Sequence, residues 1–301
     1  MPSLRRTAAL CLALAAFPAP AEAASGGVSV PTGTPSVPTA PSTPGAPAVE
    51  APQKKSGSSP LDVTSFALNG SHYFEYGRSI RATFRLAGRS GAVARMKLVV
   101  VQGGRRVSVA DMGERAVNAT QQFTLPTAGL PSGSLEVRLS GRDSRGRAIK
   151  GPGARTITIA SHRFPIVGPH NFGSQGARFG ADRDGGSRKH QGQDVMAAEG
   201  TPLVATRGGV VVFTGNQPSG AGIYAVIRGA GESRDYVYMH MVEGSLLVQR
   251  GQTVRTGQLI GKVGQTGAAQ GAHLHFEIWQ GAWQQGGTPI DPLPLLRSWD
   301  V

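Results

Sequence analysis

Two histidines one residue apart near the C-terminus are the residues of this sequence with the clearest chemical potential. The stretch Ala272–Trp279 reads Ala-His-Leu-His-Phe-Glu-Ile-Trp, in which apolar and polar residues alternate. Alternation predicts a β-strand, whose apolar face would carry Leu274, Phe276 and Ile278. The opposite face would carry His273, His275, Glu277 and Trp279. Two imidazoles on one face can bind a transition metal together, or one can bind the metal while the other moves a proton; two surface histidines are the alternative.

A second group of candidate ligands lies about 80 residues earlier. His190 and Asp194 are separated by Gln-Gly-Gln, in a segment that we expect to be a loop entering a strand. A tetrahedral zinc site accepts nitrogen and oxygen ligands together, and three protein ligands leave the fourth position open for water. His190, Asp194 and one histidine of the 273/275 pair form such a set, and the spacing does not decide between the two histidines.

A further histidine ends the segment Tyr236–His240. Alternation would place Tyr236, Tyr238 and His240 on one face, so that His240 approaches the cleft beside His273. Histidines that do not bind the metal could take up a proton from water or stabilise a developing oxyanion. We interpret His162 and His170 as structural or surface residues.

The elements that position these residues are predicted to be strands. A chain of 301 residues with 43 glycines and 21 prolines favours two domains rich in β structure and turns. From residue 161 onward no segment has helical periodicity, so the domain 161–301 should be almost entirely β. Its strand candidates are Val210–Phe213, Ile223–Ile227, Tyr236–Met241 and His273–Trp279.

The preceding segment, 61–160, has the rhythm of a β-sandwich. Apolar residues alternate with polar ones in Ile80–Leu86 and again in Leu135–Leu139, and turn sequences occur at Gly103-Gly104 and Asp143–Gly146. Short strands at this spacing are typical of an immunoglobulin- or fibronectin-type sandwich. Its carboxylates are scattered and His72 is solitary, so we interpret it as a spacer or binding module.

The first 60 residues indicate export. Arg5 and Arg6, an apolar run from Ala8 to Phe17 and a small-residue cleavage site at Ala21-Glu22-Ala23 predict a signal peptide over 1–23, with no membrane span after cleavage. Cys11 is the only cysteine and lies within that run, preceded by leucine rather than a small residue, so we expect neither a lipid anchor nor a disulfide. The segment 24–60 is rich in proline, serine, threonine and glycine, which predicts a disordered linker.

The net charge of +13 points to an anionic partner. Removal of the signal would leave 29 basic and 17 acidic residues. For an exported protein the anionic polymers of the cell wall are a more plausible partner than nucleic acid.

The order of these segments resembles the lysostaphin/LytM-type zinc metallopeptidases, over about residues 164–296. The resemblance is carried by His190–Asp194, Gly200–Ala205, Tyr238–His240, Gly251–Gln258, Gly264–Gly267 and His273–Glu277. It implies a barrel-like antiparallel core of the duplicated hybrid motif type, with a zinc groove across its sheet.

The resemblance also implies a role for each candidate. Zinc would be held by His190, Asp194 and His275, while His240 and His273 would be the catalytic histidines. The implied activity is hydrolysis of peptide cross-links or stems in bacterial peptidoglycan. Glu277 would either accept the second N–H of one of these histidines or face solvent.

Two features depart from the family pattern. Some members have a tyrosine shortly before the first ligand, whereas the run 182–189 here is charged and has no aromatic residue. The substrate loops are also short, so the preferred bond does not transfer. Two rival functions follow: a non-catalytic wall-binding activator of another hydrolase, and an exported zinc peptidase acting on glycine-rich proteins.

Overall fold

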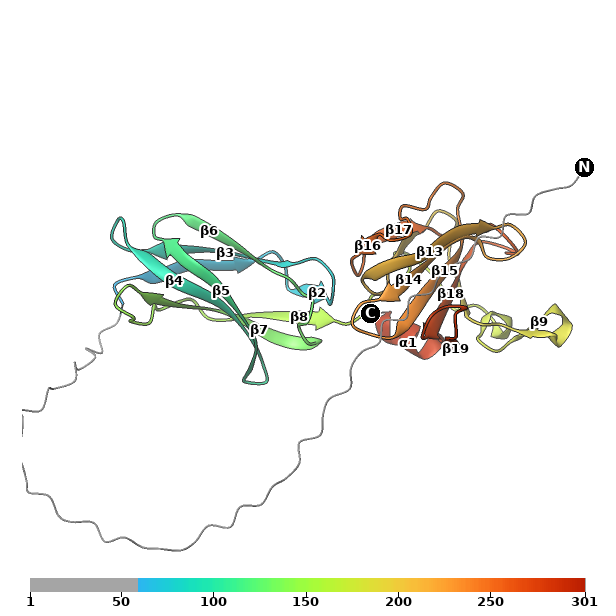
Figure 1. Ribbon diagram of the computed structural model, residues 1–301, viewed down its shortest axis with the longest axis horizontal. Helices are drawn as coiled ribbons and strands as arrows, with labels where there is room; N and C mark the ends of the chain where they lie inside the picture. The colour runs from blue at the N-terminus through green and yellow to red at the C-terminus, as the bar shows by residue number, and fades with distance from the viewer. Residues whose placement is uncertain (1–58, 301) are drawn as a thin grey trace, which may run out of the picture. The chain divides into compact units, whose positions relative to one another are not determined.

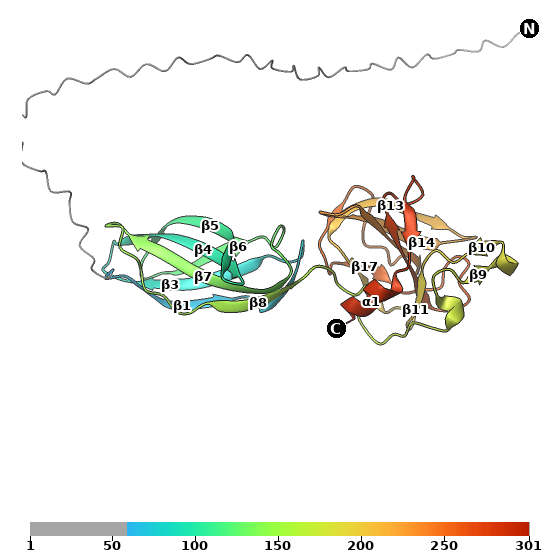
Figure 2. The ribbon, with the colours of Figure 1, turned by 90° about the horizontal axis from the view of Figure 1, so that it is seen from below.

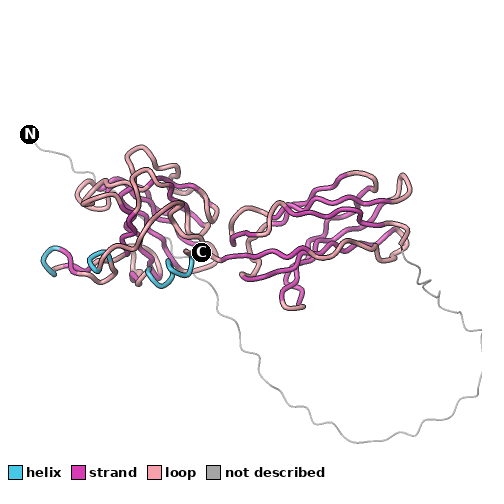
Figure 3. Tube along the Cα trace, turned by 180° about the vertical axis from the view of Figure 1, so that it is seen from behind, coloured by secondary structure: helices cyan, strands magenta, loops and turns pink. Residues whose placement is uncertain are grey.

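The structure is a computed structural model that describes residues 59–300 (Figure 1). The predicted signal peptide, Cys11 and nearly all of the predicted linker lie outside these residues. The described part is mainly β, with short helical turns among many strands (Figure 3). Within it, no helix has the length and apolar character needed to cross a membrane.

Residues 59–160 form two sheets around one apolar core. One sheet has the order β1-β3-β6 and the other β2-β8-β7-β4-β5. Their strands are β1 (Asp62–Leu68), β2 (His72–Phe74), β3 (Ile80–Ala87), β4 (Val93–Gln102), β5 (Arg105–Ala116), β6 (Thr120–Leu125), β7 (Gly133–Asp143) and β8 (Arg155–Ala160). The likeness to an immunoglobulin or fibronectin domain stays a prediction.

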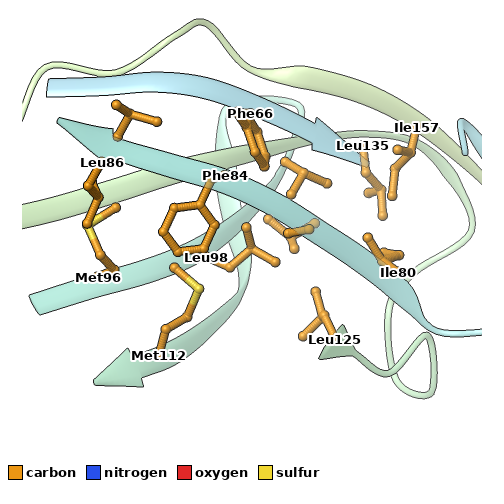
Figure 4. Packing of buried hydrophobic residues seen from close by; sticks show 14 of the residues in the cluster. Phe66, Ile80, Phe84, Leu86, Met96, Leu98, Met112, Leu125, Leu135 and Ile157 are labelled. Atoms are coloured by element: carbon orange, nitrogen blue, oxygen red, sulfur yellow. The ribbon is translucent and has the colours of Figure 1, made fainter. Parts of the chain in front are cut away.

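The core of this unit is supplied by the predicted alternation. Figure 4 shows apolar side chains from both sheets packed together, among them Phe66 and Phe84 from the first sheet and Leu98 and Leu135 from the second. The Gly103-Gly104 turn joins β4 to β5, and both glycines have positive φ, of 53° and 80°. A two-residue hairpin with positive φ at both positions favours glycine because other residues are strained there.

Residues 161–300 form a second set of sheets with its own core. The main sheet has the order β11-β18-β15-β14-β13-β16, with β19 beside β18; β12 pairs with β17, and β9 with β10 (Figures 1 and 2). The strands are β9 (Asp182–Arg183), β10 (Arg188–Lys189), β11 (Gln193–Met196), β12 (Pro202–Val204), β13 (Gly209–Gln217), β14 (Gly222–Gly229), β15 (Arg234–Met241), β16 (Thr253–Val254), β17 (Leu259–Lys262), β18 (His273–Gln280) and β19 (Thr288–Ile290). The helical turns are η1 (Gln175–Ala177), η2 (Asp184–Gly186) and α1 (Leu293–Trp299).

The four strand candidates of this region are present as β13, β14, β15 and β18, each longer than its predicted core. The sequence did not predict α1. It has seven residues, about two turns, and such a length is too short for a period of 3.6 to be recognised.

Strand β18 lies between β11 and β15 in the main sheet and is buried on both faces. Leu274, Phe276 and Ile278 enter the main core, as predicted. On the other face Trp279 packs with Val237 in a smaller apolar cluster. The polar face of β18 is therefore an enclosed surface rather than a solvent-exposed one.

Candidate metal centre

Three neighbouring strands bring the candidate ligands together through their register. β11 and β15 both pair antiparallel with β18, one on each side. Asp194 lies opposite His275 on the first side, and Met239 lies opposite His275 on the second. Residues separated by about 80 positions in the sequence thus become direct neighbours across the sheet.

Glycine at position 192 allows the His190–Asp194 segment to approach β18 closely. A Cβ atom at this position would lie 2.5 Å from the carbonyl oxygen of Phe276 and 2.9 Å from Nε2 of His275. Any side chain would push the segment away from the strand. The glycine between the two ligands is therefore required by the close approach.

The potential ligand atoms of His190, Asp194 and His275 form a small triangle. Nε2 of His190 lies 2.9 Å from Nδ1 of His275 and 3.1 Å from Oδ1 of Asp194. Nδ1 of His275 lies 2.9 Å from the same oxygen. All three residues are buried, with exposed fractions of 3%, 9% and 8%. The structure thus brings the three predicted metal ligands together.

The outer nitrogen of each histidine fixes which atom faces the triangle. Nδ1 of His190 lies 2.7 Å from the carbonyl oxygen of Arg178, and Nε2 of His275 lies 2.9 Å from a carboxylate oxygen of Glu277. Both partners are acceptors, so both outer nitrogens carry a hydrogen. In the neutral rings the inner nitrogens are lone-pair donors, and they converge with a carboxylate oxygen on one point.

This donor set fits a zinc ion. Two imidazole nitrogens and a carboxylate oxygen are ligands that zinc accepts, and three protein ligands leave a fourth position open. Tetrahedral zinc with bonds of about 2.0–2.1 Å needs ligand atoms about 3.3 Å apart. The observed separations of 2.9–3.1 Å require only a small outward movement.

The pKa shifts of Asp194 and His275 also indicate a site that favours a bound cation. Burial opposes ionisation of Asp194, but hydrogen bonds from His190 and His275 outweigh it and hold the pKa of that carboxyl well below its usual range. Burial also lowers the pKa of His275, but hydrogen bonds to Asp194 and Glu277 reverse this and raise it to about 9. Without metal, these two hydrogen bonds favour the protonated form of His275.

His240 reaches the site by a route that differs from the predicted one. Tyr236 and Tyr238 are buried in the main core, on the face opposite the site, so unbroken alternation would have directed His240 there too. Instead, the backbone of His240 has φ of +64°, at an irregularity in the β14–β15 register. This left-handed residue turns its side chain toward His273 and sends Met241 into the core. Such strain in a residue other than glycine is frequent at functional sites.

His240 and His273 lie side by side next to the triangle, with ring centroids 4.8 Å apart. Nδ1 of His240 bonds the carbonyl oxygen of Thr266 at 2.8 Å, and Nδ1 of His273 bonds that of Gly271 at 2.8 Å. In each neutral ring Nε2 is then the basic nitrogen, and that of His273 lies 3.6 Å from Oδ1 of Asp194. Burial is the main cause that lowers the pKa of His240, to about 4, so this ring is neutral at pH 7.

Glu277 is buried, with an exposed fraction of 4%. One carboxylate oxygen accepts from His275, while the other accepts from the indole N–H groups of Trp279 at 2.7 Å and Trp283 at 3.1 Å. Of the two roles open to Glu277, orientation of a ligand is the one its position fits. The sequence analysis did not identify Trp283, which lies in the turn after β18.

The charged run before the first ligand also contributes a residue that the sequence analysis did not single out. Nη2 of Arg183 lies 3.2 Å from Oδ2 of Asp194, the oxygen that does not face the triangle. The short hairpin of β9 and β10 that carries Arg183 is closed by ion pairs of Lys189 with Asp182 and of Arg188 with Asp184. Nothing in the charged run marks Arg183 out from its neighbours, whose ion pairs close the hairpin.

The other histidines have partners elsewhere. His162 bonds Ser161 and Tyr236, and His170 stacks on Phe164 with ring centroids 4.3 Å apart. His72, in the first domain, bonds its neighbour Ser71. Their structural or surface positions agree with the interpretation of the sequence.

Comparison with known proteins shows what the part of the chain that carries this site is similar to. Residues 188–292 match the model of Peptidase family M23, a range that includes all five candidate site residues. The C-terminal part of the chain is therefore similar to Peptidase family M23, which confirms the resemblance seen in the sequence.

Individual relatives cover parts of the chain. It is 43% identical over 89 residues to the peptidoglycan DD-endopeptidase ShyA of Vibrio cholerae, which is 30% of this chain and 20% of ShyA. It is 27% identical over 246 residues to the murein hydrolase activator NlpD of Escherichia coli, 72% of this chain and 60% of NlpD. The catalytic domain of lysostaphin from Staphylococcus simulans is a structural match with 28% identity and a TM-score of 0.37, covering 43% of this chain and 92% of that domain.

These matches are partial on both sides. The aligned regions span between 20% and 60% of the length of the curated relatives.

Proposed function

We propose that this chain is an exported zinc-dependent endopeptidase that hydrolyses peptide bonds in bacterial peptidoglycan, with one zinc ion per chain. The observation that carries the proposal is the convergence of His190, Asp194 and His275 on one point, with two further imidazoles directly beside it. The family match and relatives such as ShyA support the substrate class.

Each residue of the site has a distinct task in this proposal. His190, Asp194 and His275 would hold the zinc, which when bound lowers the pKa of water to about 7 and polarises a carbonyl. Nε2 of His240 and Nε2 of His273 are the basic nitrogens beside the ligands, and they accept the proton of the attacking water and return it to the leaving amine. General acid–base catalysis of this kind contributes about 10²–10⁴-fold to the rate.

The main rival is a non-catalytic activator of another hydrolase, and the relative NlpD is named as such an activator. The rival role requires no metal site. All three ligand positions and both catalytic positions are filled by suitable residues here, and this supports the peptidase. Hydrolysis of glycine-rich proteins would use the same site and differs only in substrate.

The first domain is proposed to bind anionic cell-wall polymers. Residues 59–160 contain 15 lysines and arginines against 6 aspartates and glutamates, whereas residues 161–301 contain 12 against 10. The basic charge is thus concentrated in residues 59–160. Exposed Arg81 and Arg85 on β3 have threonines as their cross-strand neighbours on β6, so no cross-strand partner there neutralises them.

The proposal is tested by measuring the release of new amino termini from purified peptidoglycan. The chain without its predicted signal, residues 24–301, is loaded with zinc and compared with Asp194→Ala; Asp111→Ala, which removes an exposed carboxylate of β5, is the matched control. We expect release by the wild type and the control, and at least a 1,000-fold loss in Asp194→Ala. Zinc binding without release from several wall types would contradict the proposal.

A further inference from the structure

We propose that Trp279 and Trp283 are positioning residues of the metal centre. Their indole N–H groups hold Glu277, and Glu277 in turn holds His275 with Nδ1 directed at the metal. The inference rests on the zinc site of the proposed function and extends it to residues outside the family pattern seen in the sequence.

The contacts form a continuous chain from the indoles to the ligand. Nε1 of Trp279 and Nε1 of Trp283 donate to the same oxygen, Oε2 of Glu277, at 2.7 Å and 3.1 Å. The other oxygen, Oε1, accepts from Nε2 of His275 at 2.9 Å. Each carboxylate oxygen therefore has a separate function, one toward the tryptophans and one toward the ligand.

Burial makes these bonds necessary. The side chain of Glu277 is 5% exposed, and a buried carboxylate is strongly destabilised unless hydrogen bonds replace its hydration. Bonds from N–H groups to a charged oxygen are shorter and stronger than neutral ones. If the two indole N–H groups were removed, Oε2 of Glu277 would lose both of these hydrogen bonds. The carboxylate could then turn away from His275.

The indole of Trp283 is itself fixed. Its backbone N–H donates to Oδ2 of Asp235 at 2.9 Å, and Oδ1 of this fully buried residue accepts from Arg228 at 2.9 Å. Its ring lies against Phe213 and Tyr224, with centroids 5.7 Å and 5.5 Å away. Trp283 is therefore placed before any metal binds, which a positioning residue requires.

A role in packing alone would need the rings but not their N–H groups. Phenylalanine retains an aromatic ring and removes the donor, so Trp279→Phe, Trp283→Phe and the double variant separate the two roles. The third tryptophan of the chain, Trp299, packs against His162 and Tyr236, and the hydrogen bonds of Glu277 go to His275, Trp279 and Trp283 instead. Trp299→Phe is thus a control with the same chemical change.

The zinc dissociation constant of each variant is measured by competition with a chromophoric chelator, and the absorption spectrum of the cobalt-substituted site is recorded. Loss of an outer partner of a metal-ligating histidine weakens metal affinity by about 10–100-fold. We expect a loss in this range for the double variant, smaller losses for the single variants, a changed cobalt spectrum, and no change in Trp299→Phe.

A double-mutant cycle tests whether the effect passes through Glu277. In a Glu277→Ala background the acceptor is absent, so Trp283→Phe should change zinc affinity by less than about twofold. An undiminished effect of Trp283→Phe in that background, or a double Phe variant that binds zinc as tightly as the wild type, would overturn the inference.

The outcomes separate this inference from the proposed function. Weakened zinc binding in the Phe variants, combined with no release from peptidoglycan by the wild type, would support the inference and contradict the proposed function. Release of amino termini by the wild type, combined with unchanged zinc affinity in the Phe variants, would support the proposed function and contradict the inference.

Discussion

Residues 161–300 contain two clusters in which histidine lies beside a carboxylate, one buried and one partly buried. In the candidate metal centre, His190, Asp194 and His275 direct potential ligand atoms at one another. In the second cluster, His162 bonds Tyr236 at 2.9 Å and Ser161 at 2.8 Å, and its ring stacks on Trp299.

The second cluster is closed because its donors match its acceptors. The hydroxyl of Tyr236 donates to Glu232 at 2.7 Å, and the same carboxylate oxygen lies 3.3 Å from Nε2 of His162. Nε of Arg207 lies 3.7 Å from the same oxygen of Glu232 and adds a positive charge to the cluster. Both clusters thus combine histidine with a carboxylate, and the surplus of converging acceptors in the first distinguishes a candidate metal site from a structural hydrogen-bond network.

The sharpest test of this comparison removes one histidine from each cluster. His275→Ala removes a ligand and should weaken zinc binding by more than about 1,000-fold, because a two-ligand site does not hold zinc against water. His162→Ala should leave zinc affinity unchanged and lower the free energy of unfolding. Metal content after dialysis and chelator competition measure both; loss of zinc from His162→Ala would remove the distinction.

The next largest effect concerns the histidines beside the ligands. His240→Ala and His273→Ala should reduce hydrolysis by about 10²–10⁴-fold while zinc affinity changes by less than about tenfold, since neither residue belongs to the triangle. Steady-state rates and chelator competition on the same preparations separate the two quantities. If either substitution abolished zinc binding, that residue would have to be reassigned as a ligand.

The cluster of His190, Asp194 and His275 should release a proton when it binds zinc. Because the pKa of His275 is raised to about 9 in the metal-free site, zinc must displace a proton from this ring at neutral pH. Zinc affinity should therefore rise about tenfold per pH unit between pH 6 and 8. Titration calorimetry in buffers with different ionisation enthalpies counts the protons released, and a count of zero would contradict the raised pKa.

The smallest effect is expected in the closed cluster and concerns stability. Burial opposes ionisation of Glu232, but hydrogen bonds from His162 and Tyr236 outweigh it and lower its pKa. A carboxyl whose pKa is lower in the folded state than in the unfolded state stabilises the protein at pH values above its unfolded-state pKa. This contribution is lost as the pH falls through the folded-state pKa.

Glu232→Gln should therefore cost about 1–3 kcal/mol of unfolding free energy at pH 7 and progressively less below about pH 4. Urea unfolding at both pH values measures this difference. An equal cost at both would show that the charge of Glu232 contributes nothing.

The parts of the site that depend on strand periodicity could be predicted from the sequence. The two faces of β18 followed from alternation, and the residue types suggested a set of His190, Asp194 and one histidine of the 273/275 pair. The choice of His275 as the ligand came from the family resemblance, because alternation places both histidines of β18 on the same face.

Other parts depend on single backbone angles and contacts across the fold. The positive φ of His240 places its side chain on the face of the sheet opposite to the one that alternation predicts. Histidine at this position does not indicate such a backbone angle. Trp283 reaches Glu277 from the turn after β18, in which Gly281 has φ of +88°. Arg183 lies in a charged run whose other pairs simply close a hairpin.

X-ray absorption at the zinc edge of the metal-loaded chain tests the central claim most directly, because it counts the imidazoles bound to the metal. The geometry predicts one zinc per chain with two imidazole nitrogens and oxygen in the remaining positions. A zinc ion bound by three or more imidazoles, or by none, would contradict the assignment of His190, Asp194 and His275 as the ligands.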